Sequence, residues 1–296
     1  MKLSLGPVLY NWDKDTVSSF YEEAIEMPVA RVYIGQAICT QRKSFKAKEI
    51  EEIAHTLQEA GKEVIISTPA LVSNEAELSF IKELLRLPFA IEANEMSALS
   101  LALKAKKEVY AGPHIECYNT EDAAFLEGLG VKGITVPMEL NKESIEKIAA
   151  VSNIDIEFAA HGHLPLAFSW RCYTLRDQGL GKADCANQCG AHPEGLTIKA
   201  SDNSGGFRIN GTSVLSMEIY SLIEKAEELK QSKSSHIRIY PELKGTKDIA
   251  DAFSDALKGK ELDLTALGLG DTVSGYFDNE ANKIKIDPTI KQRALA

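Results

Sequence analysis

Short apolar runs alternate with amphipathic stretches along almost the whole chain. The runs have the length of strands that are buried on both faces of a parallel sheet. Eight such strands are predicted to start near Leu3, Arg31, Glu63, Phe89, Glu108, Gly133, Asp155 and His236. Between them, apolar residues recur at helical spacing, for instance over 47–60, 76–87 and 144–150. Several helices are expected to start at polar residues that suit N-terminal caps, namely Asn74, Asn94, Thr120 and Asn141.

This alternation predicts an α/β fold, a (β/α)8 TIM-like barrel, with residues 1–296 forming a single barrel domain. An open doubly wound sheet is the alternative, but it usually has fewer strands and a dinucleotide-binding fingerprint after its first strand. No such fingerprint follows the first predicted strand. The nearest candidate, Gly268 and Gly270, lacks a third glycine at the required spacing and is interpreted as a turn.

One interval departs from the regular spacing. From the seventh strand near Asp155 to the eighth near His236, the chain takes about three times the usual repeat. We therefore expect an inserted segment, residues 161–215, between strand 7 and helix 7. Its later part predicts a hairpin over 196–209 that turns at 203–206, and residues 216–231 predict the barrel's own seventh helix.

Three of the five cysteines lie in this insertion, in the spacing C-x12-C-x3-C: Cys172, Cys185 and Cys189. Thiolates are soft ligands that select zinc or iron–sulfur clusters. Cys39 follows the second strand, and because loops that follow barrel strands share one face, a long insertion could bring the other three thiolates to it. Cys117, after the fifth strand, is expected to be a buried thiol outside the site.

The spacing of the last two cysteines bears on which metal is bound. Cys185 and Cys189 are four residues apart, so on a short helical turn both sulfurs would face the same way. Four thiolates suit a tetrahedral zinc or a cubane cluster. Structural zinc sites usually contain C-x2-C pairs, which this sequence lacks, so an iron–sulfur cluster is favoured over zinc.

Polar residues at strand ends are candidates for contact with a substrate. His163 is the main candidate, within the sequence His161-Gly162-His163 that ends the seventh strand. The alternatives are a hydrolase-type metal pair, or histidines that fix the loop by hydrogen bonds. Glu92, Glu116 and Glu242 also end strands, where carboxylates often pair with a nearby lysine or arginine.

Composition and charge narrow the function further. The chain has 296 residues, 44% of them hydrophobic, and its 43 acidic and 33 basic residues give a net charge of -10. A negatively charged chain is repelled by the phosphates of nucleic acids, so no nucleic-acid partner is expected. The apolar run after Lys2 is too short for a secretory or membrane segment, and a cytoplasmic location without a transmembrane segment is expected. In that reducing compartment, five cysteines favour metal binding over disulfides.

The run GHLPLA at residues 162–167, followed by Arg171 and the cysteine spacing, strongly resembles the ubiquinone-biosynthesis branch of the collagenase-like peptidase family. That family also contains collagenase-like proteases and a transfer-RNA hydroxylation protein. Further similarity covers most of the chain, at residues 4–9, 34–39, 67–71, 91–93 and 117–119. The resemblance implies a 4Fe-4S cluster whose ligands are Cys39, Cys172, Cys185 and Cys189.

The resemblance also implies a function and its partners. The chain would be the iron–sulfur subunit of an oxygen-independent hydroxylase that acts on the aromatic ring of prenylated ubiquinone precursors. It would form a heterodimer with a UbiU-like protein that has its own 4Fe-4S cluster, with prephenate as the oxygen donor and a sterol-carrier-type lipid-binding protein as an accessory. No motif identifies the residues that hydroxylate the ring, so the catalytic residues stay unknown.

Two other functions are compatible with the sequence. A collagenase-like peptidase would need a nucleophile or a metal that activates water, and neither a Ser, His, Asp arrangement nor an H-E-x-x-H motif is found. A non-catalytic scaffold would use the cluster only to stabilise its fold and to position a partner. The resemblance disfavours the peptidase and does not separate the scaffold from the hydroxylase.

Overall fold

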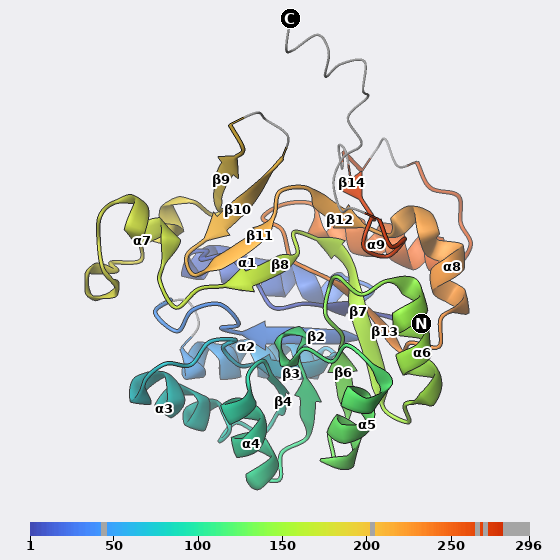
Figure 1. Ribbon diagram of the computed structural model, residues 1–296, viewed down its shortest axis with the longest axis horizontal. Helices are drawn as coiled ribbons and strands as arrows, with labels where there is room; N and C mark the ends of the chain where they lie inside the picture. The colour runs from blue at the N-terminus through green and yellow to red at the C-terminus, as the bar shows by residue number, and fades with distance from the viewer. Residues whose placement is uncertain (43–45, 202–204, 264–266, 269–271, 281–296) are drawn as a thin grey trace, which may run out of the picture.

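Eight parallel strands close into a barrel in the computed structural model, which describes residues 1–42, 46–201, 205–263, 267–268 and 272–280 (Figure 1). Each barrel strand pairs with the next, and the last pairs with both the seventh and the first, which closes the barrel. The predicted fold is confirmed, and each predicted strand start is correct to within one residue. The barrel strands are β1 (Lys2–Leu5), β2 (Arg31–Gly35), β3 (Glu63–Ser67), β4 (Ala90–Ala93), β5 (Val109–Ala111), β6 (Gly133–Thr135), β7 (Asp155–Gly162) and β13 (His236–Ile239).

Helices follow the barrel strands and cover the outside of the barrel. Asn74 and Asn141 accept backbone N–H groups of the first turns of their helices, as predicted. In the described part of the chain, no helix is both long and apolar enough to cross a lipid bilayer. The helices are α1 (Lys14–Glu26), α2 (Ala47–Glu59), α3 (Glu75–Leu84), α4 (Met96–Lys104), α5 (Thr120–Gly128), α6 (Lys142–Val151), α8 (Ala226–Gln231) and α9 (Thr246–Leu257), with short 3-10 turns η1 (Pro113–Ile115), η2 (Lys182–Asp184), η3 (Gln188–Ala191) and η4 (Ile223–Lys225).

Two of the predicted helix caps are wrong by one residue. Glu95 caps α4, because its carboxylate accepts the backbone N–H groups of the first turn. Asn94 instead belongs to the barrel, where its Nδ2 donates to the Thr68 carbonyl oxygen at 3.0 Å. Asn119 caps α5, and Thr120 is the first residue of that helix. Asn119 and Thr120 have similar capping preferences, so the sequence alone does not choose between them. At α4, Asn94 has the better preference, but its side chain is used for contacts inside the barrel.

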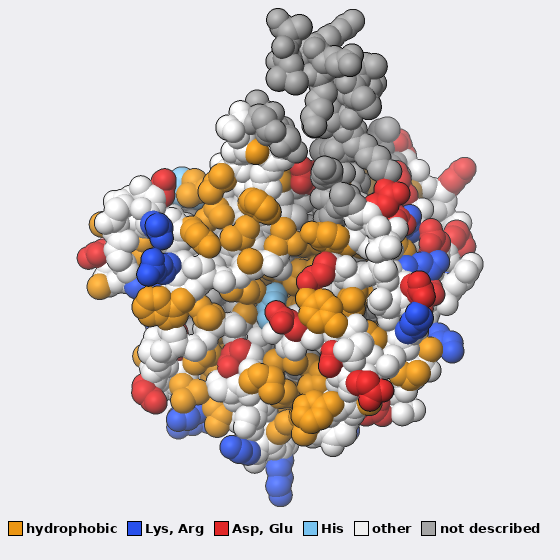
Figure 2. All heavy atoms as spheres, viewed as in Figure 1, with side chains coloured by type: hydrophobic (Ala, Val, Ile, Leu, Met, Phe, Trp, Pro, Cys, Tyr) orange, Lys and Arg blue, Asp and Glu red, His pale blue; other side chains and the backbone are white. Residues whose placement is uncertain are grey.

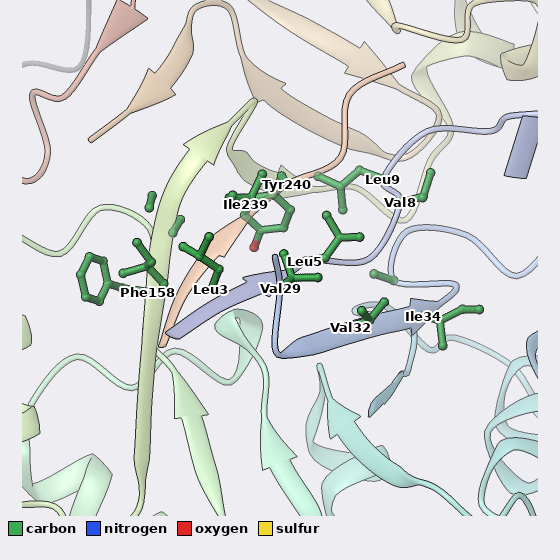
Figure 3. Close-up of a cluster of buried hydrophobic side chains, with 14 of the residues drawn as sticks. Leu3, Leu5, Val8, Leu9, Val29, Val32, Ile34, Phe158, Ile239 and Tyr240 are labelled. Carbon is green, nitrogen blue, oxygen red and sulfur yellow. The ribbon is translucent and has the colours of Figure 1, made fainter. Parts of the chain in front are cut away.

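The barrel strands direct alternate side chains outward and inward. The outward residues form the main hydrophobic core with the surrounding helices, and Figure 3 shows Leu3, Leu5, Val32 and Ile34 in this layer. The barrel strands are buried on both faces, as predicted, but the inner face is not apolar. Only a small apolar cluster around Tyr33 lies there, and most other inward side chains are polar or charged.

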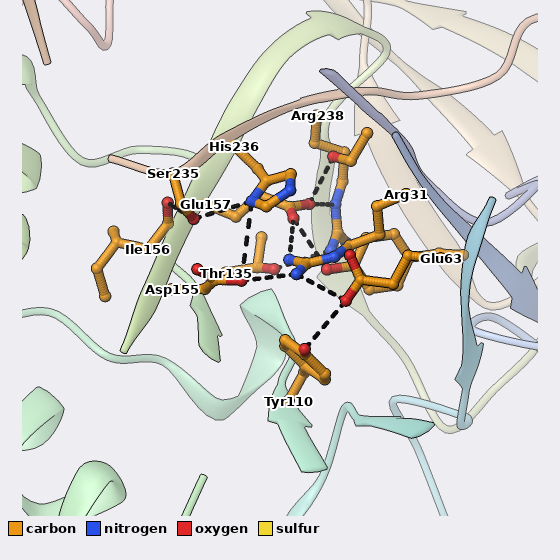
Figure 4. Close-up of polar contacts among 12 residues, drawn as sticks. Arg31, Glu63, Tyr110, Thr135, Asp155, Ile156, Glu157, Ser235, His236 and Arg238 are labelled. Atoms are coloured by element: carbon orange, nitrogen blue, oxygen red, sulfur yellow. Dashed lines mark hydrogen bonds and ion pairs between the residues drawn. The ribbon is translucent and has the colours of Figure 1, made fainter. Parts of the chain in front are cut away.

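A buried network of charges fills the barrel interior (Figure 4). Arg238 Nε lies 2.5 Å from Glu157 Oε1, and Arg238 Nη2 lies 2.7 Å from Glu92 Oε1. Arg31 joins the same network through Asp155 at 2.6 Å and Glu157 at 3.4 Å. Burial alone would lower the pKa of Arg238, but Glu157 and Glu92 outweigh it and raise that pKa. The network therefore keeps buried charges of both signs paired.

The insertion between β7 and α8 builds a second, antiparallel sheet (Figure 1). The predicted hairpin is present as two paired strands, while residues 203–204 of its predicted turn lie outside the described residues. The sheet consists, in spatial order, of β8 (Pro165–Phe168), β11 (Ser213–Ser216), β10 (Gly206–Asn210) and β9 (Leu196–Lys199), and α7 (Tyr173–Asp177) lies between β8 and β9 along the chain.

The predicted helix over residues 216–231 is only partly correct. Its first part is a strand, β12 (Ile219–Ser221), which pairs antiparallel with the end of β7 and parallel with β14 (Thr272–Val273). Only α8 in the second part is α-helical. The helical spacing of the apolar residues was a local signal, and pairing with distant strands overrides it.

The insertion packs against loops that follow barrel strands. Asn210 Nδ2 donates to the carbonyl oxygen of Leu9, after β1. Thr212 Oγ1 donates to the carbonyl oxygen of Ile38, after β2, at 3.2 Å. The second sheet is therefore fixed to the C-terminal face of the barrel, where barrel enzymes build their sites.

Candidate metal centre and adjoining pocket

Four cysteines from distant segments line one pocket where the insertion meets the loop after β2. The first follows β2, the second immediately precedes α7, and the last two lie in and beside the 3-10 turns η2 and η3. The insertion thus brings three thiols to the one that is far upstream in the sequence. In chain order the four are Cys39, Cys172, Cys185 and Cys189.

The segment between the last two cysteines is not the continuous helical turn that their spacing predicted. Ala186 and Asn187 have φ angles of 36° and 57°, in the left-handed region, which interrupts the helix. Residues other than glycine rarely adopt this conformation, and it is found preferentially at ligand sites and active sites. Cys185 and Cys189 still line the same pocket, so tertiary contacts rather than helical spacing bring them together.

A buried arginine lies beside these thiols. Arg42 is 2% exposed, and its Nη1 and Nη2 donate to the carbonyl oxygens of Tyr10 at 2.9 Å and Leu9 at 2.5 Å. Its Nε is buried and has no hydrogen-bond partner among the described residues. Burial lowers the pKa of Arg42, and the neighbouring cysteine sulfurs act in the opposite direction. A buried guanidinium with an unused donor suits a site that contains negative charge.

Residues of the loop after β1 also contact the segment that carries the last cysteine. Asn11 Nδ2 donates to Cys189 Sγ at 3.3 Å. A Cβ atom on Gly190 would lie 3.2 Å from the same Nδ2, so glycine allows this close approach. Trp12 Nε1 donates to the Pro193 carbonyl oxygen at 2.9 Å, which fixes the chain that follows the last cysteine.

Burial raises the pKa of Cys172 and Cys189, although Arg42 and Asn11 partly offset the effect at Cys189. These thiols are therefore protonated without a metal, and binding of a metal would release protons. Cys117 lies elsewhere, buried after η1, and burial raises its pKa to about 11. Such a thiol is inert at neutral pH.

Two kinds of metal site could use these thiols, a single ion or a cluster. Across the described ranges, no three His, Cys, Asp or Glu side chains converge in a way that could hold one metal ion. A cubane cluster has different requirements, because each thiolate binds a different iron and the sulfurs lie farther apart than around one ion. Four thiols around one pocket, with a buried cation beside them, fit this cluster in ligand type and charge.

A second pocket, of about 200 Å³, lies between the ends of β7 and β13, the start of α9 and the insertion. Its titratable and cationic lining residues come from both the barrel and the insertion. They are His161, His163, Glu194, Arg208, Tyr240, Glu242 and Lys244.

His163, the predicted substrate contact, lies in this second pocket together with His161. Nδ1 of His163 is 3.0 Å from the Ser216 carbonyl oxygen, so in the neutral ring Nδ1 carries the hydrogen and Nε2 is an acceptor. Burial lowers the pKa of His163 to about 4 and that of His161 to about 3. Both rings are therefore neutral near pH 7.

Glu242 has the most perturbed carboxyl group of this pocket. Its Oε1 accepts the backbone N–H of His163 at 3.1 Å. Burial raises the pKa of Glu242 to about 7, and the His163 N–H and Arg208 only partly counteract this shift. A carboxyl group in a pocket that titrates near neutral pH is a candidate for proton transfer.

The other strand-end carboxylates have different surroundings. Glu92 pairs with Arg238, as the sequence interpretation suggested. Glu116 is exposed after η1. Glu242 makes no close ion pair among the described residues, but Arg208 is near enough to lower its pKa, so for this residue the interpretation is correct only in part. Sequence reasoning did not assign a role to Arg42, whose burial depends on contacts with a loop about thirty residues away.

We expect Glu242→Gln to remove a pH-dependent loss of stability. The carboxyl group titrates near 4.5 when unfolded and near 7 when folded, so the folded state binds more protons between these values. Stability therefore falls as pH rises from about 4.5 to 7 and stays lowered above that range. At about pH 8 the variant should be more stable than the wild type by on the order of 1 kcal/mol, and this advantage should vanish below about pH 4. Urea unfolding at both pH values measures the difference, and an advantage that is the same at both would contradict the assignment.

The chain is a (β/α)8 barrel with a cysteine-lined pocket at the C-terminal ends of its strands. Peptidase family U32 matches residues 17–262, which is most of the chain, and the protein belongs to this family.

Two proteins of known name and one solved structure are similar to this chain. The chain is 27% identical over 177 residues to a 23S rRNA 5-hydroxycytidine synthase of Escherichia coli, a match that covers 56% of this chain and 27% of the relative. It is 29% identical over 125 residues to tRNA hydroxylation protein P of Helicobacter pylori, covering 41% of this chain and 29% of the relative. The matched segments thus span less than a third of either relative. Among solved structures, the chain is similar to a 7,8-dihydropteroate synthase from Vibrio fischeri, with a TM-score of 0.46, 10% identity, and coverage of 87% of this chain and 93% of that chain.

Proposed function

We propose that this chain is the iron–sulfur subunit of an oxygen-independent hydroxylase, similar to UbiV of ubiquinone biosynthesis. The observation that carries the proposal is the pocket lined by four cysteines beside buried Arg42. Membership of Peptidase family U32, and two relatives whose names refer to hydroxylated RNA, support hydroxylation as the reaction class.

In this proposal Cys39, Cys172, Cys185 and Cys189 bind a 4Fe-4S cluster, with one thiolate for each iron. When bound, such a cluster supplies one-electron chemistry. Arg42 places a positive charge and a free Nε donor at the site, and Asn11 donates to one cysteine sulfur. Donors and cations near cluster sulfurs stabilise the reduced state, because reduction adds negative charge.

The proposed substrate is the aromatic ring of a prenylated ubiquinone precursor, with prephenate as the proposed oxygen donor. The names of the two relatives refer to RNA, but the net charge of -10 gives this chain little attraction for a phosphate backbone. An apolar lipid substrate is compatible with this charge, and a sterol-carrier-type accessory protein would deliver it. His163 in the second pocket is the proposed substrate contact.

The proposed partner is a UbiU-like protein in a heterodimer. The insertion exposes apolar side chains that a partner could cover, and Figure 2 shows hydrophobic side chains gathered over the second sheet. Ile198 and Phe207 are opposite each other on β9 and β10 and are 53% and 51% exposed. Trp170, in the same insertion, is 56% exposed. Neighbouring exposed apolar residues of this kind often mark interaction sites.

Anaerobic growth tests the proposal in cells. A strain without this gene should lose ubiquinone only when grown without oxygen, and the Cys185→Ala/Cys189→Ala variant should not restore it. Cys117→Ala is the matched control, because its thiol is buried away from the pocket, and it should restore ubiquinone. Restoration by the double variant would favour a collagenase-like peptidase or a cluster-independent scaffold instead. Co-purification of the chain with a UbiU-like protein tests the heterodimer separately.

A further inference from the structure

The second pocket has a charge distribution that points to a ligand. Arg208 comes from β10, Glu194 from the segment before β9, and Lys244 and Glu242 from the loop after β13. With Glu242 protonated, the pocket has two cations and one carboxylate, a net positive charge in a chain whose total is -10. Such local concentration of positive charge attracts anions.

Arg208 has donor capacity that the protein does not use. Its Nη1 donates to the Glu194 carbonyl oxygen at 2.7 Å, which orients the guanidinium group. Its Nε is buried and has no hydrogen-bond partner in the described part of the protein. Guanidinium groups present five N–H donors and bind carboxylates through pairs of them. Lys244 is exposed at the rim and adds a second positive charge.

The remainder of the lining is suited to the apolar body of a ligand. Ile219 of β12 and Ile249 of α9 line the pocket together with the charged groups. A volume of about 200 Å³ is below the range of sites for drug-sized molecules, which begins at roughly 300 Å³. The pocket therefore suits a small molecule with one charged end and one apolar end.

Groups from every neighbouring element face Glu242. Tyr10 faces it from the loop after β1, the His163 N–H from the end of β7, Arg208 from β10 and Glu194 from the insertion. Neither His163 nor Tyr10 changes its charge near neutral pH, because the pKa of His163 is about 4 and burial raises the pKa of Tyr10 above its ordinary value. His161 also stays neutral, since its pKa is about 3.

We propose that this pocket binds a small organic acid, whose carboxylate is held by Arg208 and Lys244 and whose apolar body lies against Ile219 and Ile249, and that tight binding requires protonated Glu242. An ionised Glu242 would place a second carboxylate within a few ångströms of the ligand's carboxylate. At that separation the repulsion amounts to about 1 kcal/mol or more, depending on the local dielectric.

The pocket and the metal centre share a structural element. The backbone of Tyr10 accepts a hydrogen bond from Arg42 at 2.9 Å, and the side chain of Tyr10 faces Glu242. Glu242 and Tyr10 therefore lie between a ligand in the pocket and the arginine beside the cysteines. The role of this ligand as a reactant rests on the proposed hydroxylase function, but its binding does not depend on the cluster.

Isothermal titration calorimetry with benzoate tests the proposal on the full chain, purified without oxygen. Benzoate should bind about tenfold more weakly at about pH 8.5 than at about pH 5.5, which corresponds to about 1.4 kcal/mol. Glu242→Gln should bind benzoate equally at both pH values, because its amide stays neutral. Lys244→Met, at an exposed position that should not affect folding, should weaken binding about tenfold at the lower pH. Benzamide, the neutral analogue, should bind weakly and without pH dependence.

Three results would overturn this inference: equal benzoate affinity at both pH values in the wild type, benzamide binding as tightly as benzoate, or inorganic phosphate binding at least as tightly. The same titration on Cys185→Ala/Cys189→Ala separates this inference from the proposed function. Unchanged benzoate binding by that variant, together with loss of iron, would show that the pocket acts independently of the metal centre. If the wild type has a normal iron content but does not bind benzoate, the proposed ligand site is wrong and the proposed cluster is unaffected.

Discussion

Alanine at Cys172 is expected to remove most of the iron from protein purified without oxygen. Each cysteine of a cubane cluster binds a different iron, so loss of one thiolate opens one iron to solvent and destabilises the whole cluster. Cys172 lines the pocket with the three other cysteines and immediately precedes α7. Iron content per chain, measured against protein concentration, should fall several-fold.

Two further variants make this test specific. Cys39→Ala should lose iron to the same extent, although Cys39 is more than a hundred residues away from the other ligands in the sequence. Cys117→Ala should keep it, because this thiol is buried outside the pocket. Full iron content in Cys39→Ala would show that the insertion binds the metal without the loop after β2. Loss of iron in Cys117→Ala, with the fold intact by circular dichroism, would show that the choice of thiolates is wrong.

Replacement of Arg238 by methionine should destabilise the fold by about 3–5 kcal/mol. Arg238 is fully buried and contacts Glu157 and Glu92, so its removal leaves two buried carboxylates without their main counter-charge. A buried carboxylate without a partner must either remain charged in a poorly solvated place or take up a proton. Urea unfolding of the full chain measures the change in the free energy of unfolding.

Lys147→Met provides the matched control. Lys147 pairs with Glu143 at 2.6 Å on α6, and both side chains are well exposed. Exposed ion pairs of this kind stabilise by less than about 1 kcal/mol, so this variant should unfold almost like the wild type. If Arg238→Met cost no more than Lys147→Met, the charge network inside the barrel would have no structural role.

The fold was predictable because its signals are local. The barrel strands have apolar outward faces and most are followed directly by a helix, so the starts of the strands are visible in the sequence. The charged inner face was not predicted, because Glu157 and Arg238 are far apart in the sequence and are buried only as a pair. Likewise, residues 219–221 have helical spacing, but pairing with β7 makes them a strand.

The candidate site was predictable only in part. The spacing of Cys172, Cys185 and Cys189 identified the thiols, since cysteines this close together in an acidic chain have few other roles. The contacts around them could not be predicted, because Arg42 and Asn11 reach the pocket through backbone paths that depend on the closed barrel. Residues of this kind have no sequence motif of their own.

The most direct test of the account is the iron and sulfide content of the wild-type chain, together with its visible absorption, after purification without oxygen. We expect a brown protein with about four irons and four sulfides per chain, whose colour fades in air. A colourless protein with about one zinc per chain and no sulfide would contradict the cluster, and with it the proposed hydroxylase subunit.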